Sequence, residues 1–328
     1  MSDPHKNISE TVTRLRGMFI RHDRYSILEA EFDRLLYQRR AAQEAGAVSE
    51  APGLALIGGS GSGKSTALRW LFARHKALRP LSSEYEHADV ASFMVPSPAT
   101  LKQVGTSCLH GLGYPLRRSA TAGYIWSLVQ NSLCQRQVLF LHLDEAQDLH
   151  INQNRPERQA VVNTLKSLMQ NADWPTGLIL SGMPSLKHLL NQDAQLARRI
   201  SVLHFRPLDP AIDLKSIAGL VKTYADAAQI LADSSSLTPE FTRRILHAAA
   251  SEFGLVVELI IGAIEDAMLR QKQVFGPQNF ASAFRRRSAC IDDLNPFLRS
   301  DYSSIDARLV LTNDSDLGHE LMVGGQSK

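Results

Sequence analysis

Apolar and polar residues follow one another along the chain in blocks that predict strands separated by helices. Short apolar runs, typical of strands buried on both faces, occur at 54–59, 90–95, 138–145 and 177–182. Segments with helical spacing lie between them, at 65–78, 98–112, 121–136 and 156–171. The alternation predicts an α/β core over residues 51–208, with a parallel sheet flanked by helices.

The regions on either side of this core are predicted to be helical. Residues 1–50 carry apolar residues at mixed three- and four-residue spacing and form an N-terminal helical segment. Helical patterns also follow one another over residues 209–294, which indicates a small helical domain. Residues 295–328 contain few core-forming residues, so we expect a flexible C-terminal tail.

Composition narrows the functional classes. The chain of 328 residues has room for one large domain and a smaller one, and no apolar run approaches the roughly 18–20 residues of a membrane span. The N-terminus lacks a secretory signal and the three cysteines have no metal-binding spacing, which favours a cytoplasmic protein. With a net charge of only +3, any affinity for DNA needs a local patch or several subunits.

The strongest motif is a glycine-rich loop between the first predicted strand and the helix after it. It fits G-x-x-x-x-G-K-[ST] in full and consists of Gly58, Gly59, Ser60, Gly61, Ser62, Gly63, Lys64 and Ser65, followed by Thr66. In such a loop, backbone N–H groups surround a phosphate of ATP, Lys64 reaches the β- and γ-phosphates, and Ser65 binds Mg²⁺. Thr66 is expected near the α-phosphate. The alternative is a glycine-rich turn that binds nothing.

Two carboxylates end the apolar run at 138–145. In a P-loop enzyme, Asp144 would orient the Mg²⁺ shell and Glu145 would polarise the attacking water as a general base. The alternative is a solvated turn at a strand end. His142, in the same run, is interpreted as a core histidine with satisfied hydrogen bonds rather than a ligand.

The segments DEAQDL, LILSGMPSL and DAQLARRI, together with the phosphate loop, resemble the TniB/TnsC group of AAA+ transposition ATPases, whose more distant relatives are the MuB and IstB proteins. The resemblance covers roughly residues 20–300. Its most specific part is the ordered pair G-x-P-x-L and D-x-Q-L-x-R-R, at Gly182 to Leu186 and Asp193 to Arg199. It implies an AAA+ P-loop fold with a small C-terminal helical lid domain.

The resemblance also implies roles for further residues. Ser181 would sense the γ-phosphate and orient the lytic water, unless it only bonds local backbone. Arg198 or Arg199 would be an arginine finger offered to a neighbouring subunit, unless they pair with surface carboxylates. Val257 stands where many AAA+ proteins carry a sensor arginine, which implies slow or partner-stimulated hydrolysis.

Proteins of this group polymerise on duplex DNA with ATP, mark a target and recruit a transposase. The resemblance therefore implies that the partners are double-stranded DNA, other copies of the chain in a ring or filament, a transposase and a TniQ-like target selector. ATP hydrolysis would drive disassembly. Lys102, Arg117 and Arg118 lie in segments expected to follow the DNA backbone, although they can also be ordinary surface cations.

A different class stays open. An AAA+ loader or remodelling ATPase, of the helicase-loading or secretion-associated type, would carry the same nucleotide motifs but act on a protein partner. Such a protein would assemble with ATP alone, whereas a transposition ATPase would require duplex DNA for assembly.

Overall fold

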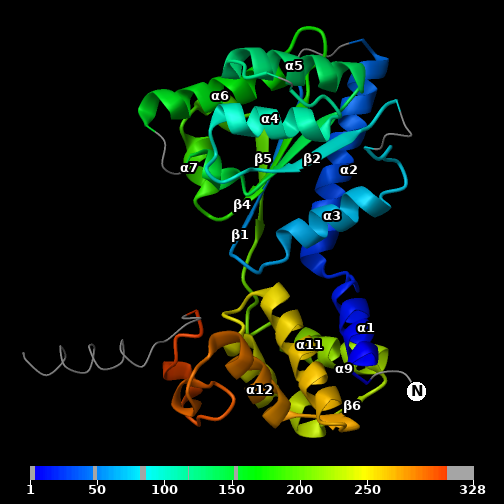
Figure 1. Cartoon of the computed structure of the whole chain (residues 1–328), viewed down its shortest axis with the longest axis vertical. Coiled ribbons are helices and arrows are strands. Elements are labelled where there is room, and N and C mark those ends of the chain that lie inside the picture. The colour runs from blue at the N-terminus through cyan, green and yellow to red at the C-terminus, as the bar shows by residue number, and fades with distance from the viewer. Residues whose placement is uncertain (1–3, 47–49, 82–85, 117, 151–153, 309–328) are drawn as a thin grey trace, which may run out of the picture. The chain divides into compact units, whose positions relative to one another are not determined.

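The computed structural model describes residues 4–46, 50–81, 86–116, 118–150 and 154–308 (Figure 1). The chain forms two compact units. The sheet unit comprises Ile20–Arg206, and the helical unit comprises Met1–Phe19 together with Pro207–Lys328. Each unit is described by itself below.

The sheet unit is built on five parallel strands in the order β2-β3-β4-β1-β5. Their bounds are β1 (Gly53–Gly58), β2 (Val90–Met94), β3 (Phe140–Asp144), β4 (Gly177–Gly182) and β5 (Ile200–Phe205). Strands β1, β3 and β4 are buried along their whole length, as their apolar runs predict. The predicted parallel α/β sheet is therefore confirmed.

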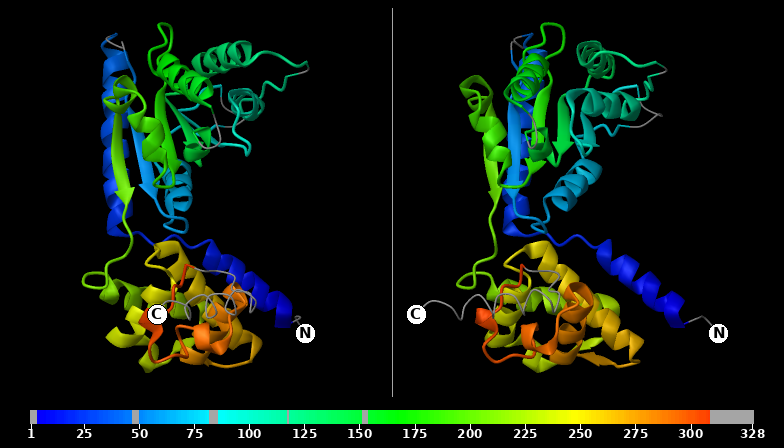
Figure 2. Two further views of the ribbon diagram at one scale, coloured as in Figure 1. Left: turned by 90° about the vertical axis from the view of Figure 1, so that its left-hand side faces the viewer. Right: turned by 60° about the vertical axis from the view of Figure 1, so that its left-hand side comes forward.

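Helices cover both faces of this sheet (Figure 2). One face carries α4 (Leu101–Gly111), α5 (Ala122–Gln135), α6 (Arg155–Met169) and α7 (Leu186–Asn191), whose apolar residues share one core with the strands. The other face carries α2 (Asp23–Glu44) and α3 (Lys64–Arg74), where the Phe32 ring packs at a tilt against Phe72 of α3 and Phe140 of β3. The turn η1 (Ala146–Leu149) follows β3, and the short helix α8 (Ala194–Ala197) precedes β5.

The helical unit contains α1 (Pro4–Arg16), α9 (Leu214–Ala228), α10 (Pro239–Ala248), α11 (Phe253–Leu269) and α12 (Pro277–Ser288). Two short strands, β6 (Leu231–Ala232) and β7 (Val274–Phe275), pair in parallel in this unit. Its short 3-10 helices are η2 (Ser234–Leu237), η3 (Asp292–Leu294) and η4 (Tyr302–Ser304). Phe241, Phe280 and Phe297 pack against one another in its core in T-shaped and tilted arrangements, with ring centroids 5.3–5.6 Å apart. In the described part of the chain, no single helix is long and apolar enough to cross a membrane; α10 and α11 meet that criterion only as a pair bent by 109°.

The structure differs from the predicted boundaries in two places. The N-terminal segment 1–50 is divided, because α1 packs against α9 and α11 whereas α2 packs on the sheet. The tail predicted from residue 295 is wrong for residues 295–308, since Asn295 is fully buried and donates to the Ala281 carbonyl at 2.9 Å. Residues 309–328 lie outside the described part of the chain.

Candidate functional site

The phosphate-loop motif lies where β1 ends and α3 begins. Gly63 adopts φ 91°, a left-handed conformation that glycine reaches at little cost, and it caps the N-terminus of α3. A Cβ on Gly58 would lie 2.8 Å from Ser62 Oγ and 2.9 Å from the Phe205 carbonyl, so this position has no room for a side chain. The first N–H groups of α3 have no acceptor within the helix, and such groups suit an anion.

Lys64 is folded into its own loop. Its side chain is buried, and Nζ donates to the carbonyls of Gly58 and Gly59, both at 2.9 Å. These carbonyls are weaker partners for an ammonium group than a phosphate would be, because a hydrogen bond between two ionised groups is stronger. Ser65 is half-buried and Thr66 exposed on the first turn of α3. The structure thus assembles the loop residues at one helix N-terminus.

Asp144 ends β3 and is buried, with 8% exposure. Ser181 of β4 donates to its Oδ1 at 2.6 Å, and the main-chain N–H of Glu145 donates to the same oxygen at 3.0 Å. Burial raises the pKa of Asp144, but hydrogen bonds from Ser181 and Ser65 outweigh it and hold the pKa below its usual value. The motif serine and the strand-end aspartate therefore meet, although 79 positions separate them in the sequence.

A directed chain of hydrogen bonds lies behind Asp144. His142 Nε2 is 2.8 Å from Ser181 Oγ, and His142 Nδ1 is 2.7 Å from Ser92 Oγ of β2. Because Ser181 gives its proton to the carboxylate, it accepts from His142, which is then protonated on Nε2 and accepts from Ser92. His142 is therefore a core histidine with both nitrogens bonded, as predicted, and burial lowers its pKa to about 4.

Ser181 lies directly against Asp144. Its side chain is fully buried, and its single proton points at Asp144. This hydrogen bond fixes the orientation of the Asp144 carboxylate, which the sequence alone did not indicate. The expected contact of Ser181 with the γ-phosphate stays a prediction.

Glu145 follows directly and has an unusual backbone, with φ 56° in the left-handed region. Its carboxylate Oε2 accepts from Gln147 Nε2 at 2.7 Å. Gln147 is buried in η1 and was not predicted as a site residue. The available signal was a glutamine in DEAQDL, two positions after the predicted general base.

The two candidate arginines differ sharply in environment. Arg199 makes a bidentate ion pair with Glu50, with Nε to Oε2 at 2.8 Å and Nη2 to Oε1 at 2.6 Å, and its side chain is 5% exposed. Hydrogen bonding from Arg199 lowers the pKa of Glu50 to about 2. Arg198 approaches Glu50 only to 3.9 Å and keeps 65% of its side chain exposed. Arg199 is committed within the chain, whereas Arg198 points to solvent.

The predicted DNA contacts lie at the start of α4 and the loop before α5. Lys102 and Arg118 are both exposed. Lys102 Nζ donates to Ser119 Oγ at 2.8 Å, which brings the two segments together and places both cations in one region. Arg117 lies outside the described residues.

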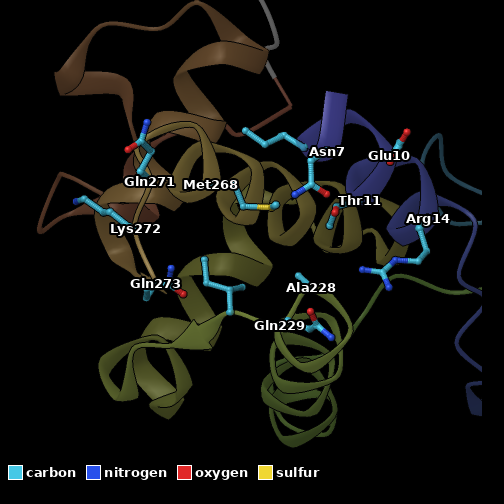
Figure 3. Close-up of a pocket in the computed structure, with 12 residues that line it drawn as sticks. Asn7, Glu10, Thr11, Arg14, Ala228, Gln229, Met268, Gln271, Lys272 and Gln273 are labelled. Carbon is cyan, nitrogen blue, oxygen red and sulfur yellow. The ribbon is translucent and has the colours of Figure 1, made fainter. Parts of the chain in front are cut away.

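Two cavities accompany these features. One of about 500 Å³ in the sheet unit is lined by Lys102 and by Asp148, which accepts from Gln147 at 3.2 Å. The other, of about 680 Å³, lies in the helical unit between α1 and the turns after α9 and α11. Figure 3 shows Arg14 of α1 and Lys272 among its polar lining residues. Neither cavity contains a residue of the phosphate-loop motif.

The oxygen atoms near the phosphate loop suit Mg²⁺ better than a metal held by protein side chains alone. In the described part of the chain, no group of three or more His, Cys, Asp or Glu side chains could hold an ion by itself. Mg²⁺ commonly keeps several waters and takes only one or two protein oxygens together with substrate phosphates. The hydroxyl of Ser65 and the carboxylate of Asp144, bonded to each other, are oxygen donors of this kind.

Comparison with solved structures defines the class. Cdc6p from Pyrobaculum aerophilum is similar with a TM-score of 0.57 at 15% identity, over 80% of this chain and 67% of that chain. The ORC2 protein of Aeropyrum pernix, in ADPNP-ADP complexes, gives 0.55 at 14% identity, over 79% and 68%. The ORC1 protein of Aeropyrum pernix, in complex with DNA, gives 0.55 at 15% identity, over 79% and 65%. At these identities the likeness concerns the fold, which is that of the AAA+ P-loop ATPases, with a helical C-terminal region.

The sequence comparison defines the family. The family model described as the bacterial TniB protein matches residues 16–209, more than half of the 328 residues. The chain belongs to the TniB family, and the resemblance inferred from its motifs is confirmed. Among curated proteins, no sequence matches the chain significantly.

Proposed function

We propose that the sheet unit binds ATP with Mg²⁺ at the phosphate loop and hydrolyses it to ADP and phosphate. The observation that carries this proposal is the meeting of the loop with the strand ends. The Ser65 hydroxyl bonds Asp144 of β3, Ser181 of β4 bonds the same carboxylate, and Glu145 follows it. A phosphate-binding helix N-terminus, an oxygen pair suited to Mg²⁺ and a neighbouring carboxylate base are together the parts that phosphoryl transfer to water requires.

Each side chain has a distinct task in this proposal. Lys64 exchanges the Gly58 and Gly59 carbonyls for phosphate oxygens when ATP enters. Ser65 and Asp144 would hold Mg²⁺, which when bound would offset the charge of the phosphates. Glu145 takes a proton from the attacking water. Ser181, with His142 behind it, keeps the Asp144 carboxylate in one orientation. The Val257 position in α11 supports slow or partner-stimulated turnover.

Arg198 is the residue that we propose as the arginine finger. An arginine that serves a neighbouring subunit must be exposed on its own subunit, and Arg198 is 65% exposed. Its neighbour Arg199 is 5% exposed and makes a bidentate ion pair with Glu50, which would have to break before Arg199 could reach another subunit. The two roles considered for these arginines are therefore divided in this proposal: Arg198 serves as the finger and Arg199 forms the ion pair with Glu50.

The biological role proposed is that of a cytoplasmic regulator of transposition. Bound to ATP, the protein assembles as a ring or filament on duplex DNA without sequence preference, marks the target, and recruits a transposase together with a TniQ-like target selector. Hydrolysis then drives disassembly. Membership of the TniB family and the exposed pair Lys102 and Arg118 support this role, because lysine and arginine contacts to phosphate give affinity without reading bases. Arg117, beside Arg118, is proposed as a third contact.

The test is electron microscopy of the purified protein with a non-hydrolysable ATP analogue, with and without duplex DNA. Assemblies that form only with both ligands are expected. Replacing Lys102 and Arg118 by alanine should reduce assembly on DNA and flatten its salt dependence, while leaving binding of the analogue unchanged. Assembly with the analogue alone, indifferent to DNA, would contradict the transposition role and favour a loader or remodelling ATPase that acts on a protein partner.

A further inference from the structure

Gln147 is bonded through both ends of its side-chain amide. Its Nε2 donates to Glu145 Oε2 at 2.7 Å and to Asp148 Oδ1 at 3.2 Å. Its Oε1 accepts from the main-chain N–H of Met183 at 3.0 Å. The residue is 5% exposed, so these bonds form away from bulk water. A buried amide with all these partners has one orientation, and its oxygen and nitrogen are distinguished by the carboxylates on one side and the N–H on the other.

Gly182 makes room for this amide. A Cβ at Gly182 would lie 2.3 Å from Gln147 Oε1, so the amide would have to move away, whereas its next contacts, at 3.4 and 3.5 Å, are ordinary ones. The backbone of Gly182 lies in a regular strand, so alanine would meet no conformational strain there. The space of the missing side chain is therefore used by one neighbour only, the Gln147 amide.

The arrangement connects two strand ends through the general base proposed above. Gln147 follows β3, and Met183 follows β4, the strand that carries Ser181. Glu145 has its main-chain N–H bonded to Asp144 at 3.0 Å and its side chain bonded to Gln147. Fixing a free glutamate side chain costs conformational entropy, and a bond to an immobile amide offsets that cost before substrate arrives.

We propose that Gln147 is a positioning residue that holds the Glu145 carboxylate at the end of β3 and ties its place to the end of β4. The proposal rests on the hydrolysis of ATP proposed above and deepens it. Gln147 touches no reacting atom. Its loss therefore lowers the rate of the chemical step and leaves the affinity for ATP unchanged, because Lys64 and the loop N–H groups keep their places.

The first test compares wild-type protein with Gln147→Met and Gln147→Glu in the presence of Mg²⁺ and duplex DNA. Methionine keeps the volume and loses all three hydrogen bonds, whereas glutamate can still accept from Met183 but cannot donate to Glu145. Single-turnover hydrolysis should fall about tenfold or more in both variants, as expected for a lost hydrogen bond to a charged group. The dissociation constant of a fluorescent ATP analogue should stay within about twofold of wild type. Gln130→Met, at a half-buried glutamine of α5 bonded to Ser167 at 2.8 Å, is the matched control and should hydrolyse ATP normally.

The second test uses Gly182→Ala alone and together with Gln147→Ala. The single change Gly182→Ala should lower single-turnover hydrolysis about as much as Gln147→Met, because its methyl group displaces the amide. In the double variant the shortened residue 147 leaves room for that methyl group. The double variant should therefore be no slower than Gln147→Ala alone, a non-additivity that general damage to the fold would not give.

The outcomes separate the two proposals. Wild-type protein that binds the analogue but never hydrolyses ATP would overturn the proposed function, and this inference with it. Wild-type protein that hydrolyses ATP, beside Gln147→Met and Gln147→Glu at the wild-type rate, would overturn the role of Gln147 alone. Additive losses in the double variant, or loss of analogue binding in Gln147→Met, would show instead that residue 147 merely supports the fold.

Discussion

Asp144 in the sheet unit and Asp266 in the helical unit are both buried, and their carboxylates are held differently. Asp144, in the sheet unit, is 8% exposed and accepts from the uncharged donors Ser65, Ser181 and the Glu145 N–H. Asp266, in α11 of the helical unit, is 5% exposed and accepts from Arg270 at 2.9 Å, Asn279 at 2.8 Å and Arg286 at 3.4 Å. Burial is similar, but only Asp266 has its charge balanced by cations in these bonds.

The different partners suit different roles: Asp266 stabilises the packing of its unit, whereas Asp144 belongs to the candidate site. Burying a carboxylate costs free energy unless charge and hydrogen bonds compensate it. At Asp266 the compensation is complete within the chain, which fastens α11 to α12 through Asn279 and Arg286. At Asp144 the hydroxyl and N–H donors orient the carboxylate without neutralising it, which suits a group that awaits a cation from outside the chain.

The largest effect that we expect is a loss of ATP hydrolysis with no change in thermal stability, on replacement of Arg198. Arg198→Ala should lower ATP hydrolysis by about 10³-fold or more, the effect of removing an arginine finger. The thermal stability should be unchanged, since the Arg198 side chain is 65% exposed. Arg199→Ala, the matched variant, should instead lower stability, because it removes a buried side chain and its bidentate pair with Glu50, although the 40% exposure of Glu50 limits the loss.

Mixing subunits gives a sharper test of the same residue. Arg198→Ala subunits retain a complete loop and base, and Glu145→Gln subunits retain the arginine. If the finger acts on the neighbouring subunit, a mixture of the two inactive variants should recover part of the activity. No recovery in mixtures shown to co-assemble would contradict a finger supplied in trans.

The next prediction applies the comparison of the two aspartates directly. Asp266→Asn should lower the free energy of unfolding by about 2 kcal/mol, because Arg270 and Arg286 lose a charged partner, although their partial exposure limits the cost. Asp144→Asn should change it by less than about 1 kcal/mol, since relief of the buried charge offsets the weaker hydrogen bonds. Chemical denaturation of both variants without nucleotide measures this, and equal losses would contradict the distinction.

The smallest predicted effect is a pH dependence in the sheet unit. Burial lowers the pKa of His22 from 6.5 to about 4, and its Nδ1 accepts the Tyr25 N–H at 3.1 Å at the start of α2. The unfolded chain takes up the proton first, so stability from this group is complete above pH 6.5 and is lost as pH falls toward about 4. The loss should be about 1–2 kcal/mol after allowance for partial exposure.

His22→Asn provides the control for this titration, because asparagine can accept the same N–H at a helix start without titrating in this range. Thermal melts between pH 7 and pH 4 should show a shallower decline for this variant than for wild type. Parallel declines would contradict the assignment to His22.

Much of the sheet unit could be predicted from the sequence, because buried parallel strands consist of apolar runs and the phosphate loop has a motif of fixed spacing. Strand β5 was missed since it is an edge strand, with polar and apolar residues alternating in ISVLHF and Val202 half exposed. The ribbon of β6 and β7 was missed for another reason: two-residue strands leave no periodicity to detect.

The remaining features depend on contacts between distant segments. The sequence does not distinguish Arg198 from Arg199. Their environments differ because Arg199 forms an ion pair with Glu50, which lies 149 positions earlier in the chain. The direction of the Ser181 hydroxyl depends on His142 and Ser92 from two other strands. The packing of Asn295 and Phe297 against α10 and α12 likewise depends on contacts with distant segments, which the composition of residues 295–308 does not indicate.

The central claim is that the strand ends of the sheet unit bind ATP and hydrolyse it with Glu145 as the base. The most direct measurement is single-turnover hydrolysis of radiolabelled ATP by wild type and Glu145→Gln with Mg²⁺ and duplex DNA, with nucleotide binding measured in the same samples. We predict equal binding and a fall in hydrolysis of about 10²-fold or more for Glu145→Gln. Hydrolysis by Glu145→Gln at the wild-type rate, or a wild-type protein that binds no ATP, would contradict the account.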